Sequence, residues 1–273
     1  MRRTRNACPQ YSSPAAKGFA KGSVDFMLVS KRRVTRLFVE RDLTGDALAL
    51  DEREAHYLGH VLRLQRGDEL IAFNGRGMER HATVSSLQRR AALLELRAQH
   101  AALPESPLDL TLLQALPKAD AMDLIVQKAT ELGIRSIVPV YSEFSVVKLD
   151  AERTERRVLH WRRIAQSACE QCGRHRPPQI ETPTPLTESL GELPPTATRL
   201  ALDPDAATAF AHAAPPTDGC VVAVGPEGGF GAADWRRLDA AAFQRVSLGA
   251  RVLRAETAAI AIGAIAQSRW GDL

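Results

Sequence analysis

The feature that most limits the fold of this chain is an alternation of short apolar runs with helical segments, which begins near residue 108. Consecutive parallel strands cannot be joined by a tight hairpin, so each needs a crossover segment, usually a helix. Repeated alternation therefore predicts an α/β fold with a mostly parallel sheet and helices on both faces. The runs predicted to be strands are LDLTLLQAL, IRSIVPV, ATRLALD, GCVVAVG and FQRVSLG.

Two helices are predicted among these strands. The segment KADAMDLIVQKATELG has apolar residues at helical spacing, namely Met122, Ile125, Val126, Ala129 and Leu132. The next residue, Gly133, stands where a C-terminal helix cap belongs. Residues 153–173 form a second, longer and arginine-rich helix in this prediction.

The N-terminal part has a different pattern, made of short strand-like runs. LFVE, ALAL, DELIAF and AALLELR are candidate strands, and Asn74-Gly75 is typical of a hairpin turn. One helix is expected within DEREAHYLGHVLRL, where Asp51 and Glu54 match a capping box. A proline-containing linker follows at 101–107. We therefore predict a small β domain over 34–103 and a larger domain over 104–273.

The charge is concentrated near the N-terminus. The net charge is +4, and the first 41 residues hold ten Lys or Arg side chains against only Asp25 and Glu40. A basic end on a folded body suits a polyanionic partner such as nucleic acid. Residues 1–33 are predicted to be a disordered extension. The alternatives for it are a solvated tail without function, a wrongly assigned start codon or a transit peptide.

Location and redox chemistry are indicated by what the sequence lacks. Four cysteines in 273 residues do not make a disulfide framework. No secretory signal is evident, and the longest apolar run, Ala258–Ala266, is too short to cross a bilayer. We therefore expect a cytoplasmic protein with no membrane contact. Cys169 and Cys172 form one CxxC pair, a weak zinc or redox signal, which we interpret as helix packing with no metal.

A glycine-rich corner, GPEGG, follows the apolar run GCVVAVG. It has neither the Lys-Ser/Thr of a phosphate loop nor the G-x-G-x-x-G spacing of a dinucleotide fold. Gly228 and Gly229 permit close approach of a ligand, Pro226 stiffens the corner, and Glu227 argues against phosphate. The corner suits a neutral or cationic ligand held by backbone groups. A tight turn with no ligand is the alternative.

A second glycine-bearing strand exit lies about twenty residues further on, in SLGARVLRAETAAIAIGAIAQ. It leads through a short basic loop into a helix that is apolar almost all round. Such a helix is buried in a core or at a subunit interface. Ligands of open α/β sheets bind beyond the carboxyl ends of the strands. The two exits can therefore line one pocket, with Arg254, Glu256 and Thr257 at its mouth.

Four separated segments resemble the RsmE family of ribosomal RNA methyltransferases, which are SPOUT-class enzymes. They are VGPEGGF, LGARVLRAETA, QALPKADAMDLIVQKATELGI and QSACEQCGR, and they occur in the family's order. The resemblance covers the chain from about Arg36 to the C-terminus. It implies a C-terminal SPOUT-type parallel sheet with a trefoil knot and an N-terminal PUA-like β-barrel domain that helps to grip RNA. It also implies an active homodimer.

The resemblance further implies a reaction. The family transfers a methyl group from S-adenosyl-L-methionine to N3 of one uridine in 16S ribosomal RNA, so the expected partner is that RNA or the small ribosomal subunit. S-adenosylmethionine carries a sulfonium cation and no phosphate, which agrees with the character of the glycine corner. The residues expected to bind it are Leu202, Gly225, Pro226, Glu227, Gly228, Gly229, Leu248, Gly249, Leu253, Arg254, Thr257 and Ala258.

Methylation at N3 requires loss of the N3 proton, which calls for a general base or for stabilisation of the uridine anion. The candidate catalytic residues are Arg174, Arg254 and Glu256. Arginine almost never deprotonates, so the two arginines suit anion stabilisation or RNA phosphate contact. Glu256 suits either the base or a cap of the helix that follows. The sequence leaves these alternatives open.

Basic residues outside the pocket are candidates for RNA binding. They are Arg32, Arg33, Arg36, Arg63, Arg66 and Lys118, and solvated surface charge is the alternative for each. Two rival functions are weighed against the methyltransferase. A non-catalytic RNA-binding module disagrees with the intact glycine corner, and a nucleotide-binding hydrolase disagrees with the missing phosphate loop.

Overall fold

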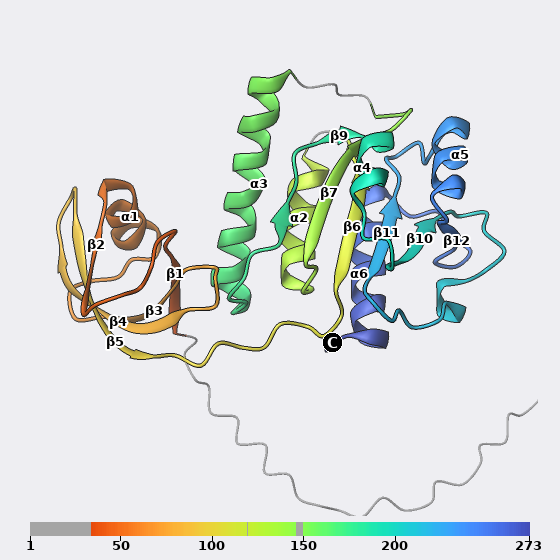
Figure 1. Ribbon diagram of the computed structural model, residues 1–273. Helices are drawn as coiled ribbons and strands as arrows, with labels where there is room; N and C mark the ends of the chain where they lie inside the picture. The colour runs from red at the N-terminus through yellow and green to blue at the C-terminus, as the bar shows by residue number, and fades with distance from the viewer. Residues whose placement is uncertain (1–33, 119, 146–149) are drawn as a thin grey trace, which may run out of the picture. The chain divides into compact units, whose positions relative to one another are not determined.

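The computed structural model describes residues 34–118, 120–145 and 150–273 (Figure 1). The predicted extension over 1–33, with Arg32 and Arg33, lies outside these residues. No helix in the described part of the chain is long and apolar enough to cross a membrane.

The N-terminal part contains a five-stranded sheet in the order β1-β3-β4-β5-β2. β1 runs parallel to β3, and the other pairs are antiparallel. Alternate side chains point into one apolar cluster that includes Leu37, Leu70 and Leu94. The strands are β1 (Thr35–Phe38), β2 (Ala47–Leu50), β3 (Glu69–Phe73), β4 (Glu79–Leu87) and β5 (Ala92–Gln99). The four predicted strands are confirmed, and β4 was missed by the prediction.

Two local predictions in this part are confirmed. β3 and β4 form a hairpin around Asn74-Gly75, closed by the Asn74 N–H donating to the Met78 carbonyl at 3.2 Å. The Asp51 carboxylate accepts the Glu54 N–H at 2.8 Å, and the Glu54 carboxylate accepts the Asp51 N–H at 2.9 Å. This capping box starts α1 (Glu52–His56), which continues as a single π-helical turn, η1 (Tyr57–Val61).

The C-terminal part is built on a parallel sheet in the order β12-β10-β11-β6-β7-β8, with β9 paired to β7. Every strand pair in it is parallel. The predicted parallel sheet is therefore confirmed. Its strands are β6 (Leu110–Ala115), β7 (Ser136–Tyr141), β8 (Gln179–Ile180), β9 (Thr184–Pro185), β10 (Thr198–Leu202), β11 (Cys220–Val224) and β12 (Gln244–Val246).

Helices cover both faces of this sheet. Successive residues of β11 point to opposite sides and pack against different helices. Val222 belongs to one apolar cluster, with residues of α2, α3 and α6, whereas Val221 belongs to another, with residues of α4 and α5. Gly133 follows α2 with φ of 75°, which confirms the predicted C-terminal cap. The helices are α2 (Ala121–Glu131), α3 (Ala151–Cys172), α4 (Leu186–Glu192), the short η2 (Phe210–His212), α5 (Ala232–Ala240) and α6 (Ala255–Trp270).

The part that holds the N-terminal sheet and the part that holds the parallel sheet belong to one compact unit, Val34–Leu273, and a carboxylate on α3 bonds to the N-terminal part twice. Glu170 accepts the Phe38 N–H of β1 at 2.8 Å and the Tyr57 hydroxyl of η1 at 2.6 Å. Gly75 lies in the same contact region, since a Cβ built there would stand 2.8 Å from the Phe38 ring and 3.2 Å from Pro177. The N-terminal domain is thus fastened to the carboxyl-terminal half of α3.

Candidate functional site

A cavity lies at the carboxyl edge of the parallel sheet, where β10, β11 and β12 end side by side. Three chain segments that leave these strands surround it, together with the first turns of α6. Because the three strands are adjacent and parallel, their exits converge on the same edge. The lining residues are Leu202, Asp203, Pro204, Val224, Gly225, Pro226, Glu227, Gly229, Val246, Leu248, Gly249, Arg251, Val252, Leu253, Ala255 and Ala258.

The glycine corner forms one wall of the cavity. Its turn is closed by the Gly229 N–H, which donates to the Pro226 carbonyl at 2.9 Å, and Gly229 has φ of 70°. A Cβ at Gly225 would stand 2.9 Å from the Gly229 carbonyl carbon, which is backbone and cannot rotate away. The corner therefore needs glycine at 225 for space and at 229 for its backbone conformation.

Glu227 connects the corner to the neighbouring strand exit. Its carboxylate accepts the backbone N–H of Lys118 at 2.8 Å, just beyond the end of β6. The Lys118 side chain itself is exposed. The carboxylate of Glu227 is thus held at the carboxyl edge beside the cavity, where it favours a cationic ligand group over an anionic one.

The segment after β7 supports the corner from outside. Asp234 is fully buried, and its carboxylate accepts the Glu143 N–H at 2.8 Å. A Cβ at Gly228 would lie 3.4 Å from the Phe144 side chain, so Gly228 faces this segment and does not line the cavity. Glu143, Phe144 and Asp234 were missed by sequence reasoning. The only available signal was that residues 142–145 follow a predicted strand at the ligand-binding edge.

Most of the residues expected to bind the cofactor lie around this cavity. Those that line it are Leu202, Gly225, Pro226, Glu227, Gly229, Leu248, Gly249, Leu253 and Ala258. Gly228, Arg254 and Thr257 do not line it, although each is next to a residue that does or within two positions of one. The structure adds Asp203, Arg251 and Val252 to the wall, with Val252 82% exposed.

Arg254 and Glu256 lie where the cavity wall continues into α6. Arg254 is the N-cap residue of this helix, is exposed, and makes no capping hydrogen bond with its side chain. Glu256 is half-buried in the first turn. A carboxylate in this first turn suits either of the two roles considered for Glu256, the base or the stabilisation of the helix start.

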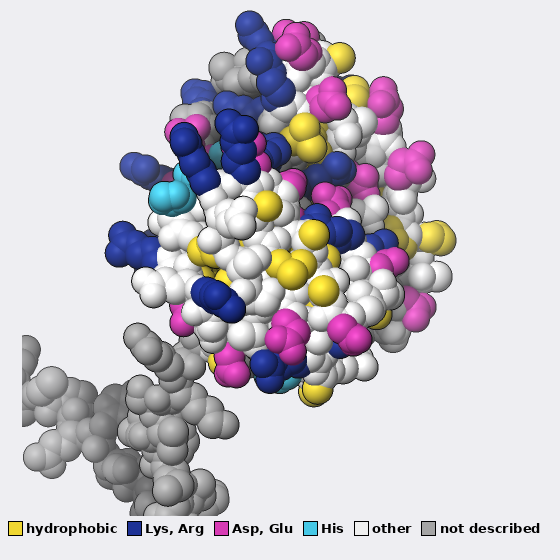
Figure 2. Space-filling view, turned by 90° about the vertical axis from the view of Figure 1, so that its left-hand side faces the viewer, with side chains coloured by type: hydrophobic (Ala, Val, Ile, Leu, Met, Phe, Trp, Pro, Cys, Tyr) yellow, Lys and Arg dark blue, Asp and Glu magenta, His cyan; other side chains and the backbone are white. Residues whose placement is uncertain are grey.

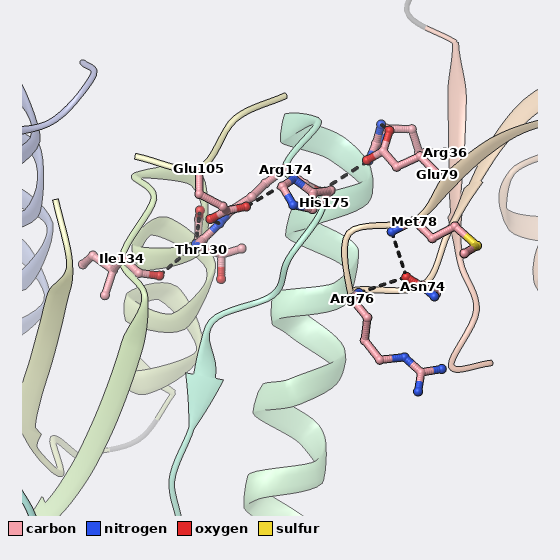
Figure 3. A network of polar contacts seen from close by, with 10 residues as sticks. All are labelled: Arg36, Asn74, Arg76, Met78, Glu79, Glu105, Thr130, Ile134, Arg174 and His175. Carbon is pink, nitrogen blue, oxygen red and sulfur yellow. Dashed lines mark hydrogen bonds and ion pairs between the residues drawn. The ribbon is translucent and has the colours of Figure 1, made fainter. Parts of the chain in front are cut away.

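Arg174 is held in a structural position apart from the cavity lining (Figure 3). Its Nε donates to Glu105 Oε2 at 2.8 Å, and its Nη1 donates to the carbonyls of Thr130 at 3.2 Å and Ile134 at 2.8 Å. The side chain is only 10% exposed. These contacts tie the linker to the end of α2 and the start of β7, and they occupy the guanidinium expected to stabilise an anion.

Arg36 requires a correction. It was expected to contact RNA phosphate, but its guanidinium is buried in an ion pair with Glu79, as Figure 3 shows. Two hydrogen bonds join the pair, one of them 3.1 Å long between Nη1 and Oε2. Its guanidinium carbon also lies 4.5 Å above the Phe73 ring centre. The pairing links β1 to β4 across the sheet, so Arg36 is a core residue of the N-terminal domain.

The remaining basic candidates are accessible. Arg63, Arg66 and Lys118 are all exposed, and Arg63 has φ of 56°, in the left-handed region, just after η1. Their positions permit contact with a large ligand.

The cysteines have the character of packing residues. Burial raises the pKa of the Cys169 thiol to about 12 and that of Cys220 to about 12. Both thiols therefore stay protonated and unreactive at neutral pH, because the thiolate is the reactive form. Within the described residues there is also no group of three or more His, Cys, Asp or Glu side chains that could hold a metal ion.

We expect iodoacetamide at pH 8 to leave Cys169 and Cys220 unmodified in the folded protein. The raised thiol pKa values keep both residues in the protonated form at this pH. Peptide mass spectrometry after a timed reaction measures the outcome, and the same reaction in denaturant is the control in which both become labelled. Rapid labelling of either cysteine in the folded state would contradict this assignment.

Comparison with known proteins gives the same family in both parts of the chain. The family described as "RNA methyltransferase domain" matches residues 104–267, and "RNA methyltransferase PUA domain" matches residues 50–97. Ribosomal RNA small subunit methyltransferase E of Synechocystis is 33% identical over 217 residues, which are 77% of this chain and 69% of the relative. The protein of the same name from Buchnera aphidicola of Schizaphis graminum is 29% identical and covers 89% of this chain and 99% of the relative.

Solved structures agree with the sequence relatives. Ribosomal RNA small subunit methyltransferase E from Neisseria gonorrhoeae, bound to S-adenosyl methionine, has a TM-score of 0.82 and 33% identity, covering 88% of this chain and 99% of that one. A putative methyltransferase from Legionella pneumophila with bound SAM has a TM-score of 0.84 and 31% identity, covering 88% of this chain and 100% of that one.

Proposed function

We propose a function from one premise, which is that this chain belongs to the RNA methyltransferase family of ribosomal RNA small subunit methyltransferase E. The function is transfer of a methyl group from S-adenosylmethionine to N3 of a uridine in the 16S RNA of the small ribosomal subunit. The observation that supports it is the cavity where the exits of β10, β11 and β12 converge, since nine of the twelve residues expected to bind the cofactor line it.

The lining of the cavity fits S-adenosylmethionine. Apolar side chains of Leu202, Leu248 and Leu253 offer a wall for the adenine ring, and backbone groups between them can read its polar edge. Two carboxylates, Asp203 and Glu227, also line the cavity. They suit the sulfonium cation and would repel the phosphates of a nucleotide. The relatives from Neisseria and Legionella were solved with this same cofactor bound.

When bound, the cofactor would supply an electrophilic methyl group. The residues of the chain must then remove the N3 proton of the uridine and hold its lone pair in line with that methyl group. Because Glu256 lies in the first turn of α6 beside the cavity wall, we assign its carboxylate as the acceptor of the N3 proton. Arg254 stands two residues earlier, where its guanidinium can stabilise the uridine anion. With the proton held on the Glu256 carboxyl, the N3 lone pair would be free to accept the methyl group that the cofactor supplies.

The assembly and the topology are part of the same proposal. Val252, at 82%, and Ile265, at 39%, leave apolar side chains exposed beside the cavity and along α6. A second copy of the chain would cover them, which supports the homodimer. The trefoil knot of the family and a cytoplasmic location, where ribosomes are assembled, are proposed from family membership.

We expect the purified protein to methylate 16S ribosomal RNA that comes from a strain lacking it, and to do so only with S-adenosylmethionine. N3 lies on the pairing edge of uracil, so its methylation produces a stop in primer extension by reverse transcriptase, which locates the target.

Glu256→Gln should lower kcat by roughly 10²- to 10⁴-fold, the usual contribution of general base catalysis, while cofactor affinity is kept.

A cofactor that binds without any methylation of RNA or assembled subunits would leave a non-catalytic RNA-binding module as the function. An undiminished kcat for Glu256→Gln would remove Glu256 from the mechanism and leave the rest of the proposal in place.

A further inference from the structure

Helix α3 carries an arginine-rich surface that the proposed reaction does not use. Its buried stripe includes Thr154, Val158 and Trp161, which pack toward the domain core. The charged side chains lie on its other sides. The first 13 residues of the helix include five arginines but only two acidic residues, Glu152 and Glu155. The arginines are Arg153, Arg156, Arg157, Arg162 and Arg163, of which only Arg157 is half-buried and the others are exposed. A surface of this kind attracts polyanions.

Part of this surface surrounds a hollow. A cavity of about 510 Å³ is lined by Arg153, Arg156, Arg157 and His160 from α3, and by Asp120 and Asp123 at the start of α2. We call these four basic side chains the arginine face. Asp123 is already committed within the protein, since it lies 2.8 Å from His160 Nε2 and accepts the Trp161 Nε1–H at 3.1 Å. The lining thus holds three arginines against two aspartates, one of which is already engaged by neighbouring side chains.

The arginines of this face are only weakly held by the protein. Arg153 lies 3.3 Å from Asp150, and Arg156 lies 3.5 Å from Glu152, with all four side chains more than 60% exposed. Exposed pairs of this type contribute at most about 1 kcal/mol, so a ligand can replace them. For Arg157, no carboxylate of the described residues lies within ion-pair distance. These guanidiniums are thus free to bind an external anion.

The arginine face lies at the same end of the domain as the cofactor cavity. In Figure 1, β6 and β7 point toward the end at which α3 begins. The chain leaves β7 at Tyr141, passes Glu143 and Phe144 against the glycine corner, and enters α3 at Ala151. Figure 2 shows Lys and Arg side chains gathered in the upper part of the face that it presents, toward this end of the molecule. The arginine face and the cavity therefore both lie toward the edge of the sheet at which the RNA would be held.

We propose that the arginine face binds the phosphates of the RNA that flank the target nucleotide, as a contact separate from the N-terminal domain. This inference rests on the proposed function, because it names a surface for the same RNA. Guanidinium groups bind phosphate oxygens in paired hydrogen bonds, which favours arginine over lysine at such sites. Residues three and four apart on a helix are neighbours, so Arg153, Arg156 and Arg157 can act on one backbone segment.

The test replaces two arginines of this face and measures RNA affinity without cofactor. Arg156→Ala/Arg157→Ala should bind a 16S RNA fragment that contains the methylated site roughly tenfold more weakly than the unaltered protein. The magnitude of the slope of log affinity against log salt concentration should decrease by about two, which corresponds to the loss of about two phosphate contacts. Filter binding at several salt concentrations measures both quantities, and calorimetry with S-adenosylmethionine should show unchanged cofactor affinity.

The matched control is Arg135→Ala/Arg236→Ala, which removes the same charge elsewhere. Arg135 precedes β7 at the opposite edge of the sheet and lies 3.5 Å from Asp109, as Arg156 does from Glu152. Arg236 is exposed on α5, on the other face of the sheet. The control should keep the RNA affinity and salt slope of the unaltered protein. An equal loss in both variants would show a net-charge effect and overturn the proposal.

Two further results would also overturn it. One is unchanged RNA affinity of the α3 variant. The other is loss of binding to assembled small subunits with unchanged binding to naked RNA, which would assign the face to an acidic protein surface. Failure of the proposed function is seen separately, as absence of cofactor binding and of methylation in the unaltered protein, because the RNA titration needs neither.

Discussion

Gly225→Ala should weaken binding of S-adenosylmethionine by at least about 100-fold relative to the unaltered protein, for which micromolar affinity, about −8 kcal/mol, is expected. The added Cβ would stand 2.9 Å from the Gly229 carbonyl carbon, 3.0 Å from Gly229 Cα and 3.2 Å from the Phe230 nitrogen. All three are backbone atoms, so the turn itself must open. Since Gly225, Pro226 and Gly229 line the cavity, its wall moves with the turn. Isothermal titration calorimetry measures the loss.

Gly191→Ala is the matched control for this substitution. Gly191 lies in α4, and a Cβ there meets no atom within 4 Å. The control should bind the cofactor as the unaltered protein does. A urea unfolding curve for each variant distinguishes loss of cofactor binding from loss of the folded structure. Gly249→Ala is a second test of the cavity wall. That residue lines the cavity with φ of 103°, and a Cβ there meets no atom within 4 Å. Unchanged affinity in both cavity variants would exclude the glycine corner as the cofactor wall.

Glu79→Ala should lower the free energy of unfolding by about 3–5 kcal/mol, because it leaves the charge of Arg36 buried without its partner. The Glu79 side chain is 1% exposed and that of Arg36 is 9% exposed. The other polar contact of the guanidinium is a long one, 3.5 Å to the Arg174 carbonyl. Urea denaturation followed by circular dichroism measures the change.

Two comparisons make the interpretation specific. Asp42→Ala breaks the exposed pair with Arg76, whose side chains are 61% and 67% exposed, and should change stability by less than about 1 kcal/mol. Arg36→Met/Glu79→Leu removes both charges and should recover much of the stability that Glu79→Ala loses. A loss below about 1 kcal/mol for Glu79→Ala would mean that water or a shifted side chain compensates Arg36 there.

Features encoded within a few residues of one another could be predicted from the sequence. The capping box of Asp51 and Glu54 and the glycine after α2 are contacts over three or four positions. The parallel sheet was predicted from the alternation of apolar runs with helical segments along the chain. The placement of Gly225 and Leu248 on one cavity follows from a general rule about strand ends, with the family resemblance supplying the particular residues.

Features that depend on partners far along the chain could not be predicted. Arg36 looks like surface charge until Glu79, 43 residues away, is brought opposite it by the pairing of β1, β3 and β4. Arg174 meets Glu105 across 69 residues. β4 was missed because its sequence, ERHATVSSL, is largely polar, and its strand character comes from pairing with β3 and β5.

The hydrogen bonds of Glu170 to the N-terminal domain limit how the length of α3 can vary. The helix has 22 residues, with Glu170 near its end and Arg153 near its start. One residue inserted between Arg153 and Glu170 would rotate the start of the helix by about 100° relative to its end. The arginines would then no longer face the carboxyl edge of the sheet. An insertion of about seven residues, close to two full turns, restores the orientation but lengthens the helix by roughly 10 Å. The spacing between the two ends of α3 is therefore set in discrete steps, and no gradual change in the helix can adjust it.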